Sequence, residues 1–338
     1  MAASQRRADP ARLPRLRAAA QLLHRPVSIR DPVEVARAVA GVQAQDMFAA
    51  RLSFRSRSRW LKAADIDQAR TEERSLLRTW VMRMTIHLIP SDDAGWWLPL
   101  FEPGIEKWSR RRLGQLGMPA RTQERALREV VRMLERDGPL TRTEVGNRLR
   151  EMGIELNNST RGHIMGLAVT SGNACLGPDR KGGSCLVLRR DWLGDLPPFD
   201  REKALAELAR RYLSAFGPAT DRDFAYWAGL GLGEVRVEEE TLLALRGELP
   251  RLPRAGQLRM LGNFDTYLLG WKDRSFSVPD HHVAVVKEGG GGWIRPVIVR
   301  DGVVIGGWRS LRKAGGIEIS FNLSGSISAA ARKAIDAE

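Results

Sequence analysis

The sequence predicts an α+β protein in which similar helical modules follow one another and a small β-domain closes the chain. Three observations indicate this fold class. A motif recurs in the middle of the chain, two short strands flank a glycine-rich tip after its first copy, and glycine turns separate short apolar runs near the C-terminus. A sequence repeat of this kind indicates that each copy is one supersecondary unit.

The repeated motif occupies residues 138–145 and 217–224, which lie 79 positions apart. Each copy begins with Gly-Pro and follows an apolar-periodic helix, predicted at 124–134 and 203–216. In each copy a threonine precedes an acid by three residues, the spacing of a capping box. A second helix is therefore expected to begin after Thr141 and again after Thr220.

A winged-helix order follows the first copy of the motif. The sequence predicts a third helix at 159–171, then two short strands at 174–176 and 185–188 around the basic, glycine-rich tip. In a winged helix the third helix enters a major groove while the hairpin contacts the DNA backbone or the minor groove. Strand-like segments at 257–261 and 266–271 suggest the same module after the second copy.

The N-terminal third resembles a more diverged copy. Asp31-Pro32 is a typical N-cap and first helical residue, so a helix is expected over 33–43. A second helical stretch covers 60–71. The segment 76–89 alternates β-branched and polar residues and predicts a strand or hairpin.

From residue 275 onward the chain becomes β-rich. Asp301-Gly302 is a favourable two-residue hairpin turn. The strands expected here are 283–286, 294–299, 303–305 and 316–322. We therefore divide the chain into an N-terminal module (1–118), a second module (119–198), a third module (199–274) and a C-terminal β-domain (275–338).

The composition favours a nucleic-acid partner. Fifty-four Lys and Arg residues against 40 Asp and Glu leave a formal net charge of +14. Basic side chains that meet phosphates release condensed counterions, so a polyanion is the favoured partner. The alternative is that arginine has accumulated in a high-GC genome without any binding role.

The apolar residues do not predict a membrane protein. Hydrophobic residues make up 43% of the chain, enough for buried cores, but no apolar run approaches the ~20 residues of a membrane helix. Two cysteines are too few for a disulfide framework or a four-ligand zinc site. We therefore expect a cytoplasmic, nucleoid-associated protein without membrane contact.

One cluster of polar side chains stands out as candidate chemistry. Gln43, Gln45 and Asp46 bring two carboxamides and a carboxylate together near the end of a predicted helix. Carboxamide oxygens can orient a water molecule and stabilise positive charge. The residues alone leave open the alternative that both glutamines cap or solvate a helix end. The five histidines show no metal-binding spacing, so neither a metal nor a cofactor is expected.

Basic residues near these motifs are candidates for phosphate contacts. Arg51 follows the amide cluster, and Arg180 and Lys181 occupy the predicted wing tip. Arg78, Arg83 and His87 lie on the predicted strand region. The alternatives are pairing with local acids for the strand residues and simple solvation for the wing tip.

Four segments together resemble the winged-helix DNA glycosylase family of AlkZ and YcaQ. They are Gln43-Ala44-Gln45, the stretch 77–90 (LRTWVMRMTIHLIP), the stretch 264–270 (FDTYLLG) and the stretch 301–309 (DGVVIGGWR). The four lie in the family's order and span nearly the whole chain. The chain departs from the family pattern at two points. Met84 stands where the family usually has glycine, and the family usually has a proline near the position of Gly262.

The resemblance implies three tandem winged-helix modules that form a C-shaped DNA-binding body, followed by a small C-terminal β-barrel. It implies a monofunctional DNA glycosylase that excises N7-alkylated purines from double-stranded DNA by water attack and has no lyase activity. Gln43 and Gln45 are then catalytic, with a supporting role for Asp46. The paired-glutamine form resembles the branch that unhooks bulky adducts and interstrand crosslinks.

We accordingly expect a monomeric, cofactor-independent repair enzyme that acts on alkylated DNA without a protein partner. Two other functions remain open at this point. A non-enzymatic winged-helix transcriptional regulator predicts a specific operator and indifference to substitution of Gln43 or Gln45. A protein-interaction scaffold predicts no salt-dependent DNA binding.

Overall fold

A computed structural model describes residues 12–24, 28–180, 183–235, 252, 254–287, 293–323, 333 and 335. The chain divides into two compact units, one formed by Met1–Ala63 with Ala206–Glu338 and the other by Ala64–Leu205. Neither unit coincides with one of the four predicted segments. No helix in the described ranges combines the length and apolar composition that crossing a bilayer requires.

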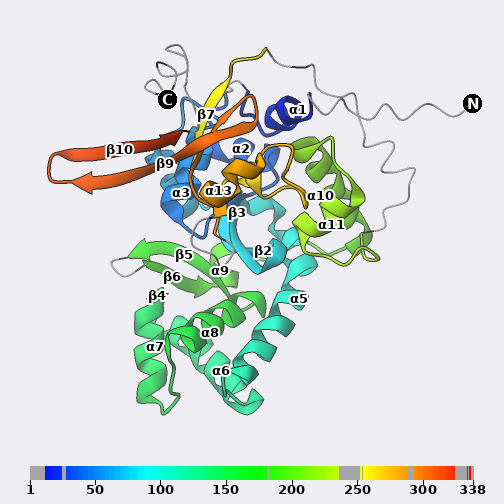
Figure 1. The fold of residues 1–338 in the computed structure, drawn as a ribbon. Helices are drawn as coiled ribbons and strands as arrows, with labels where there is room; N and C mark the ends of the chain where they lie inside the picture. The colour runs from blue at the N-terminus through cyan, green and yellow to red at the C-terminus, as the bar shows by residue number, and fades with distance from the viewer. Residues whose placement is uncertain are drawn as a thin grey trace, which may run out of the picture. The chain divides into compact units, whose positions relative to one another are not determined.

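The unit Ala64–Leu205 contains helices and a sheet of antiparallel strands (Figure 1). Its strands are hydrogen-bonded in the order β3-β2-β5-β6-β4. In chain order its elements are α4 (Ala63–Thr71), β2 (Leu76–Val81), η1 (Met82–Met84), β3 (Thr85–Pro90), η2 (Ser91–Asp93), α5 (Ala94–Gln115), α6 (Ala120–Asp137), β4 (Leu140–Thr141), α7 (Arg142–Glu151), α8 (Asn158–Thr170), β5 (Ala174–Arg180), β6 (Gly183–Leu188) and α9 (Arg189–Leu193).

The second predicted segment has the expected element order, α6-β4-α7-α8-β5-β6. The capping box at the start of α7 is confirmed, since the Glu144 amide donates to Thr141 Oγ1 (3.2 Å) and the Thr141 amide donates to the Glu144 carboxylate (2.6 Å). β4 pairs with β6 through Leu140 and Leu186, which both belong to the apolar core under α6 and α8. This core fixes the hairpin β5–β6 on the helices.

The unit Met1–Ala63 with Ala206–Glu338 combines helices with an antiparallel sheet in the order β10-β9-β8-β7. In chain order its elements are α1 (Leu13–Ala20), α2 (Pro32–Ala38), β1 (Val42–Gln43), α3 (Met47–Arg55), α10 (Arg201–Phe216), α11 (Asp221–Ala228), β7 (Leu258–Leu261), η3 (Thr266–Leu268), η4 (Asp280–His282), α13 (Val283–Lys287), β8 (Val297–Arg300), β9 (Val303–Lys313) and β10 (Gly316–Leu323).

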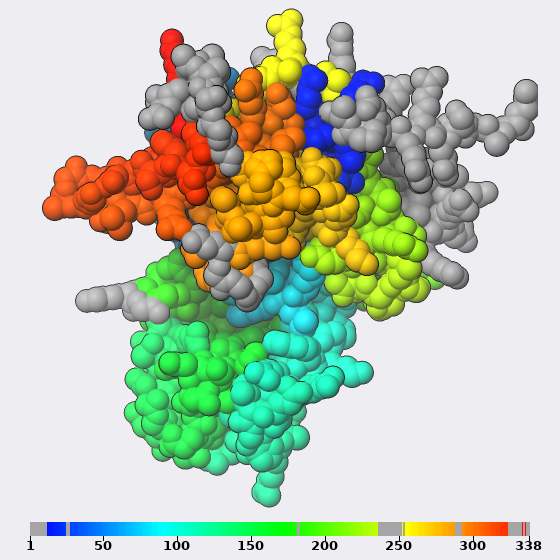
Figure 2. Space-filling view, viewed as in Figure 1, coloured from blue at the N-terminus to red at the C-terminus, as the bar shows by residue number. Residues whose placement is uncertain are grey.

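The C-terminal sheet is open. Among the described strands β7 and β10 form its two edges, so the predicted closed barrel is not found. The distal part of the β9–β10 hairpin extends away from the rest of its unit and carries exposed apolar side chains such as Leu311 and Ile317 (Figure 2). The predicted hairpin turn is confirmed, because Asp301 (φ 52°) and Gly302 (φ 82°) connect the paired residues Arg300 and Val303.

An aromatic core holds α10 and α11 together. Tyr212, Phe216 and Trp227 lie with ring centroids 5.0–5.5 Å apart. Trp271 packs edge-on against Phe216 and its Nε1 donates to the Phe216 carbonyl at 3.0 Å. The second capping box is also confirmed, with the Asp223 amide 3.1 Å from Thr220 Oγ1. Large aromatic faces are therefore used here for packing.

Three predicted elements differ in the structure. The strand expected at 266–271 is wrong, because Asp265 accepts the Tyr267 amide (3.0 Å) and closes a 3₁₀ turn there. The strand expected at 283–286 is the helix α13, which continues a turn opened by Pro279. The helix from Asp31 ends at Ala38, since Gly41 adopts a φ of 89°.

The third predicted module is only partly comparable. Its helices α10 and α11 are found, and the expected strand at 257–261 is β7. β7 pairs with β8 of the C-terminal sheet, with Leu258 opposite Arg300, so it does not form a wing with 266–271. Residues 236–251 of this module lie outside the described ranges.

Candidate active site and DNA-binding residues

The amide motif lies on a short connection between two helices. Gly41 turns the chain after α2, and β1 then places Gln43 in a buried position, with 6% of its surface exposed. Gln45 follows on a bend and is exposed. The motif therefore precedes the start of a helix, rather than ending one as the sequence suggested.

Asp46 begins the next helix. Its carboxylate Oδ1 accepts the Phe48 amide at 2.9 Å, so Asp46 is the N-cap of α3. A carboxylate at this position also offsets the positive end of the helix dipole. Asp46 thus fixes the direction in which α3 leaves the motif and sets the charge beside Gln45. Arg51 lies half-buried on the same helix.

The far end of α3 is anchored by a buried ion pair. Arg57, just beyond the helix, donates two hydrogen bonds of 2.9 Å to the Asp265 carboxylate, and neither side chain is exposed. Ser53 donates to the same carboxylate at 2.8 Å. Arg57 also donates to Gln21 Oε1 (3.0 Å) and Thr266 Oγ1 (2.8 Å). This network ties α3 to α1 and to the segment after β7.

The first turn of α3 also packs closely on the loop that follows β7. A Cβ added to Gly262 would lie 3.3 Å from the Ala49 carbonyl oxygen and 3.4 Å from Leu52 Cβ. A side chain at this position would therefore require the loop or the helix to shift slightly. Gly262, near which the family usually has a proline, therefore lies in contact with α3.

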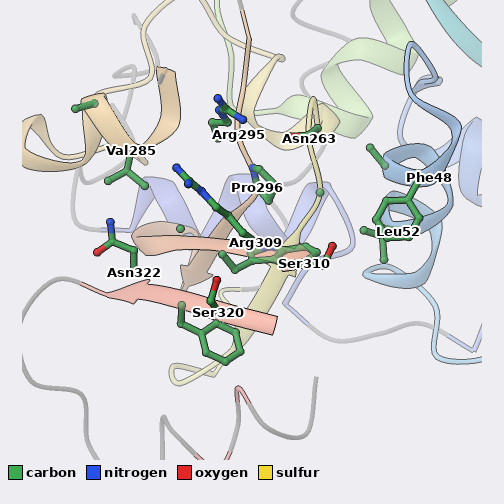
Figure 3. A pocket seen from close by; sticks show the side chains of 16 residues that line it. Phe48, Leu52, Asn263, Val285, Arg295, Pro296, Arg309, Ser310, Ser320 and Asn322 are labelled. Atoms are coloured by element: carbon green, nitrogen blue, oxygen red, sulfur yellow. The ribbon is translucent and has the colours of Figure 1, made fainter. Parts of the chain in front are cut away.

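A pocket of about 740 Å³ opens beside the first turns of α3, within the same unit. Phe48 and Leu52 of α3 form one side, and Val285 of α13 lies opposite (Figure 3). Arg295 and Arg309 reach the space between these sides (Figure 3). We call this space the α3 pocket.

The α3 pocket is amphipathic and cationic. Trp308 forms part of its wall and is held by a hydrogen bond from Nε1 to the Leu261 carbonyl (2.9 Å). Its polar lining residues include Asn263, Ser310 and Ser320. No acidic residue is among the described residues that line it.

In the other unit, a hydrogen bond connects Arg78 on β2 to the β5–β6 hairpin, which carries Arg180. Arg78 on β2 donates to Ser184 Oγ at 2.5 Å, and Ser184 lies opposite Asp179, one pair before the end of the β5–β6 hairpin. Buried Arg70 bonds the Gly177 carbonyl (3.1 Å) and the Asp179 carboxylate (2.5 Å). These contacts hold the distal part of the hairpin, at the end of which Arg180 is exposed. Lys181 lies outside the described residues.

Arg83 and His87 lie where β2 turns into β3. Arg83 and Met84 adopt left-handed conformations with φ of 51° and 59°. His87 is 2% exposed, and its Nδ1 lies 3.2 Å from the Thr85 carbonyl. Burial, with a further contribution from the nearby Arg83 charge, lowers the His87 pKa to about 3. The ring is therefore buried and neutral at physiological pH, and a phosphate contact by His87 stays a prediction.

The structure thus places Gln43, Gln45, Asp46 and Arg51 on one segment of one unit, and Arg78, Arg83 and Arg180 in the other. Sequence reasoning missed the α3 pocket and the ion pair behind the motif. Arg57 and Asp265 are 208 positions apart, and no local pattern links them. The conspicuous stretch 264–270 was the only signal, because it contains Asp265.

Comparisons with known proteins agree with one another. The chain is 31% identical over 309 residues to the "Interstrand DNA cross-link repair glycosylase" of Streptomyces sahachiroi. The aligned region covers 80% of this chain and 80% of that protein. The structure of this chain is similar to the solved structure of the Streptomyces sahachiroi DNA glycosylase AlkZ. The TM-score is 0.73 and the sequence identity is 25%, and the match covers 98% of this chain and 95% of that one. The family model described as DNA glycosylase AlkZ-like matches residues 36–338, so the chain belongs to the AlkZ-like DNA glycosylases.

Proposed function

We propose that this glycosylase hydrolyses the N-glycosidic bond of N7-alkylated purines in double-stranded DNA and that it also unhooks bulky adducts or interstrand crosslinks. The observation that carries the proposal is the position of Gln45, which is exposed on a bend directly before the capped start of α3. The Streptomyces sahachiroi relative is named as an interstrand crosslink repair glycosylase, which supports the extension to crosslinks.

The chemistry of the lesion explains why two neutral amides suffice. A purine alkylated at N7 carries a positive charge and is a good leaving group, so its departure needs no strong general acid. The barrier lies in the oxocarbenium character that develops on the sugar and in the placement of a water molecule behind it. Carboxamide oxygens stabilise the cationic sugar and accept hydrogen bonds from that water.

We assign Gln45 to direct contact with the water and the sugar, because it is exposed. We assign a supporting role to Gln43, which is buried. Asp46 supports both through its N-cap bond, which orients α3 and places negative charge next to the developing cation. No lysine nucleophile is required, and a monofunctional reaction without strand cleavage follows.

We propose that phosphate contacts come from Arg51, Arg78, Arg83 and the wing residues Arg180 and Lys181. The wing assignment has the best support, because Arg180 is exposed at the end of a hairpin whose distal part is held by buried Arg70. The element order α6-β4-α7-α8-β5-β6 supports a winged-helix module.

The test is single-turnover kinetics on a duplex with one N7-methylguanine. We expect Gln45→Ala and Gln43→Ala each to lower the excision rate by well over tenfold while DNA affinity changes by less than about twofold. Borohydride should trap no covalent enzyme–DNA complex. Gln115→Ala, at an exposed glutamine at the end of α5, is the control and should keep the wild-type rate.

Near-normal rates in both glutamine variants would overturn the catalytic assignment while leaving the family membership intact. A wild-type protein that binds the duplex but releases no base from any N7-alkylated substrate would instead contradict the proposed reaction.

A further inference from the structure

The α3 pocket is larger than the proposed catalytic task requires. Its volume of about 740 Å³ falls in the range of pockets that enclose drug-sized ligands, roughly 300–1,000 Å³. A methyl group on guanine would leave most of this space empty. The size therefore indicates an occupant that extends well beyond a purine.

The walls of the pocket indicate the chemistry of that occupant. Phe48 of α3 is 52% exposed, and its aromatic face borders a space whose other walls include Val285 and Trp308. Apolar and aromatic walls of this kind suit a flat hydrophobic group. The serine and asparagine side chains of the lining suit carbonyl or hydroxyl oxygens on the same group.

The charge of the pocket argues against the alkylated base itself. Arg295 and Arg309 line the space (Figure 3), and no described lining residue is acidic. An N7-alkylated guanine is cationic, and the described lining offers it two guanidinium groups and no carboxylate. The same guanidinium groups stack favourably on a neutral aromatic ring and donate hydrogen bonds to its oxygens.

The pocket is also within reach of the proposed reaction. Phe48 lies three residues after Gln45, so their Cα atoms are at most about 11 Å apart. Both residues lie in the same unit, at the start of the anchored helix α3. The Cα atom of Gln45 therefore lies within about 11 Å of that of Phe48, which forms one wall of the pocket.

We propose that the α3 pocket binds the part of a bulky N7 adduct that lies outside the guanine, a neutral aromatic group bearing carbonyl or hydroxyl oxygens. This inference rests on the proposed glycosylase function and deepens it. Phe48, Arg295 and Arg309 are then specificity residues that favour bulky adducts over methylated bases.

The experiment compares two duplexes of identical sequence. One carries N7-methylguanine, and the other carries the N7-guanine adduct of aflatoxin B1 epoxide, a polycyclic group with several oxygens. The variant Ala284→Trp fills the pocket from α13 at an exposed position. We expect the ratio of kcat/KM for the bulky substrate to that for the methylated one to fall at least tenfold relative to wild type.

Val283→Trp is the matched control. Val283 is the exposed neighbour of Ala284 on the same helix and is not among the residues that line the pocket. It should keep the wild-type selectivity ratio, and thermal unfolding of both variants confirms that they are folded. A folded Ala284→Trp with a ratio within twofold of wild type would overturn the proposal.

Two further outcomes distinguish a failure of the pocket assignment from a failure of the proposed glycosylase function. A wild-type enzyme that excises N7-methylguanine but not the bulky adduct contradicts the pocket assignment and leaves the glycosylase function standing. A wild-type enzyme that excises neither base contradicts the proposed function itself.

A DNA phosphate is the competing occupant, and Arg309→Ala distinguishes it. If the pocket holds an adduct, this variant lowers kcat/KM for the bulky substrate at least fivefold more than for the methylated one. Equal losses on both substrates, with a shallower salt dependence of DNA binding, would show a phosphate in the pocket and overturn the proposal.

Discussion

Arg57 and Asp265 form a bidentate ion pair with no exposed surface, and it joins the end of α3 to the segment after β7. Burial by itself would raise the pKa of Asp265, but the charge and hydrogen bonds of Arg57 outweigh this effect and hold the pKa below its ordinary value. The carboxylate therefore stays ionised at neutral pH, and the pair acts as a fixed anchor for the helix that carries the motif.

The first prediction concerns this anchor. Asp265→Ala leaves the Arg57 charge buried without its partner, so we expect the free energy of unfolding to fall by about 3–5 kcal/mol. Urea unfolding measures the change. The double variant Arg57→Met/Asp265→Leu removes both charges and should regain much of the loss, and equal destabilisation of the single and double variants would contradict the assigned role of the unpaired charge.

The second prediction concerns acid stability. The pKa of His87 is lowered from 6.5 to about 3 in the folded protein, so in this pH interval the unfolded chain binds a proton that the folded chain does not. Stability is therefore present above pH 6.5 and is lost as the pH falls toward 3, by up to about 1.4 kcal/mol per pH unit.

The His87 effect is measured as the pH dependence of urea unfolding between pH 7 and 4. His87→Asn cannot titrate, so its stability should fall less steeply with acid than that of the wild type. Gln115→Asn, at an exposed position that does not titrate, is the control and should keep the wild-type slope. Parallel slopes for wild type and His87→Asn would show that His87 is protonated in the folded protein.

The third prediction concerns the turn between β2 and β3. Met84 adopts a φ of 59°, where a side chain with a Cβ costs about 1–2 kcal/mol. Met84→Gly removes that strain, and the greater freedom of glycine in the unfolded chain offsets part of the gain. We expect a net stabilisation of about 0.5–1 kcal/mol, whereas Met84→Ala keeps the Cβ and should give no gain. A loss of stability in the glycine variant would contradict the assignment of strain to this turn.

The fourth prediction concerns the wing. Arg180 is exposed at the end of β5, and Lys181 follows it in the sequence. If each meets one phosphate, replacing both by alanine lowers the slope of log affinity against log salt by about two, and Arg180→Ala alone by about one. Lys203→Ala, at an exposed residue paired with Asp200, is the control. An unchanged slope in the double variant would remove the wing from the interface.

Features that depend on neighbouring residues were predictable from the sequence. The two capping boxes, the Asp31 cap and the Asp301-Gly302 turn each follow from side chains within a few positions of the backbone that they stabilise. The run from Val283 to Val286 was not, because four apolar residues satisfy a strand and a helix equally well.

The candidate site was predictable only in part. Two carboxamides near a helix boundary are visible in the sequence, and the resemblance to a family marked them as catalytic. The N-cap role of Asp46 was not predicted, because the helix before the motif was expected to run on to Gln43. The α3 pocket combines residues from α3, α13, β9 and β10, which meet only through tertiary packing.

The two ends of helix α3 differ in exposure, since its start is exposed and its end is anchored by buried residues. The motif and exposed Phe48 lie at its start, and the buried Arg57 network lies about 13 Å further on, after nine helical residues. Substitutions at distant positions usually add independently. A laboratory selection for new substrates can therefore randomise Phe48 and the strand residues across from it while the scaffold keeps its tolerance to mutation.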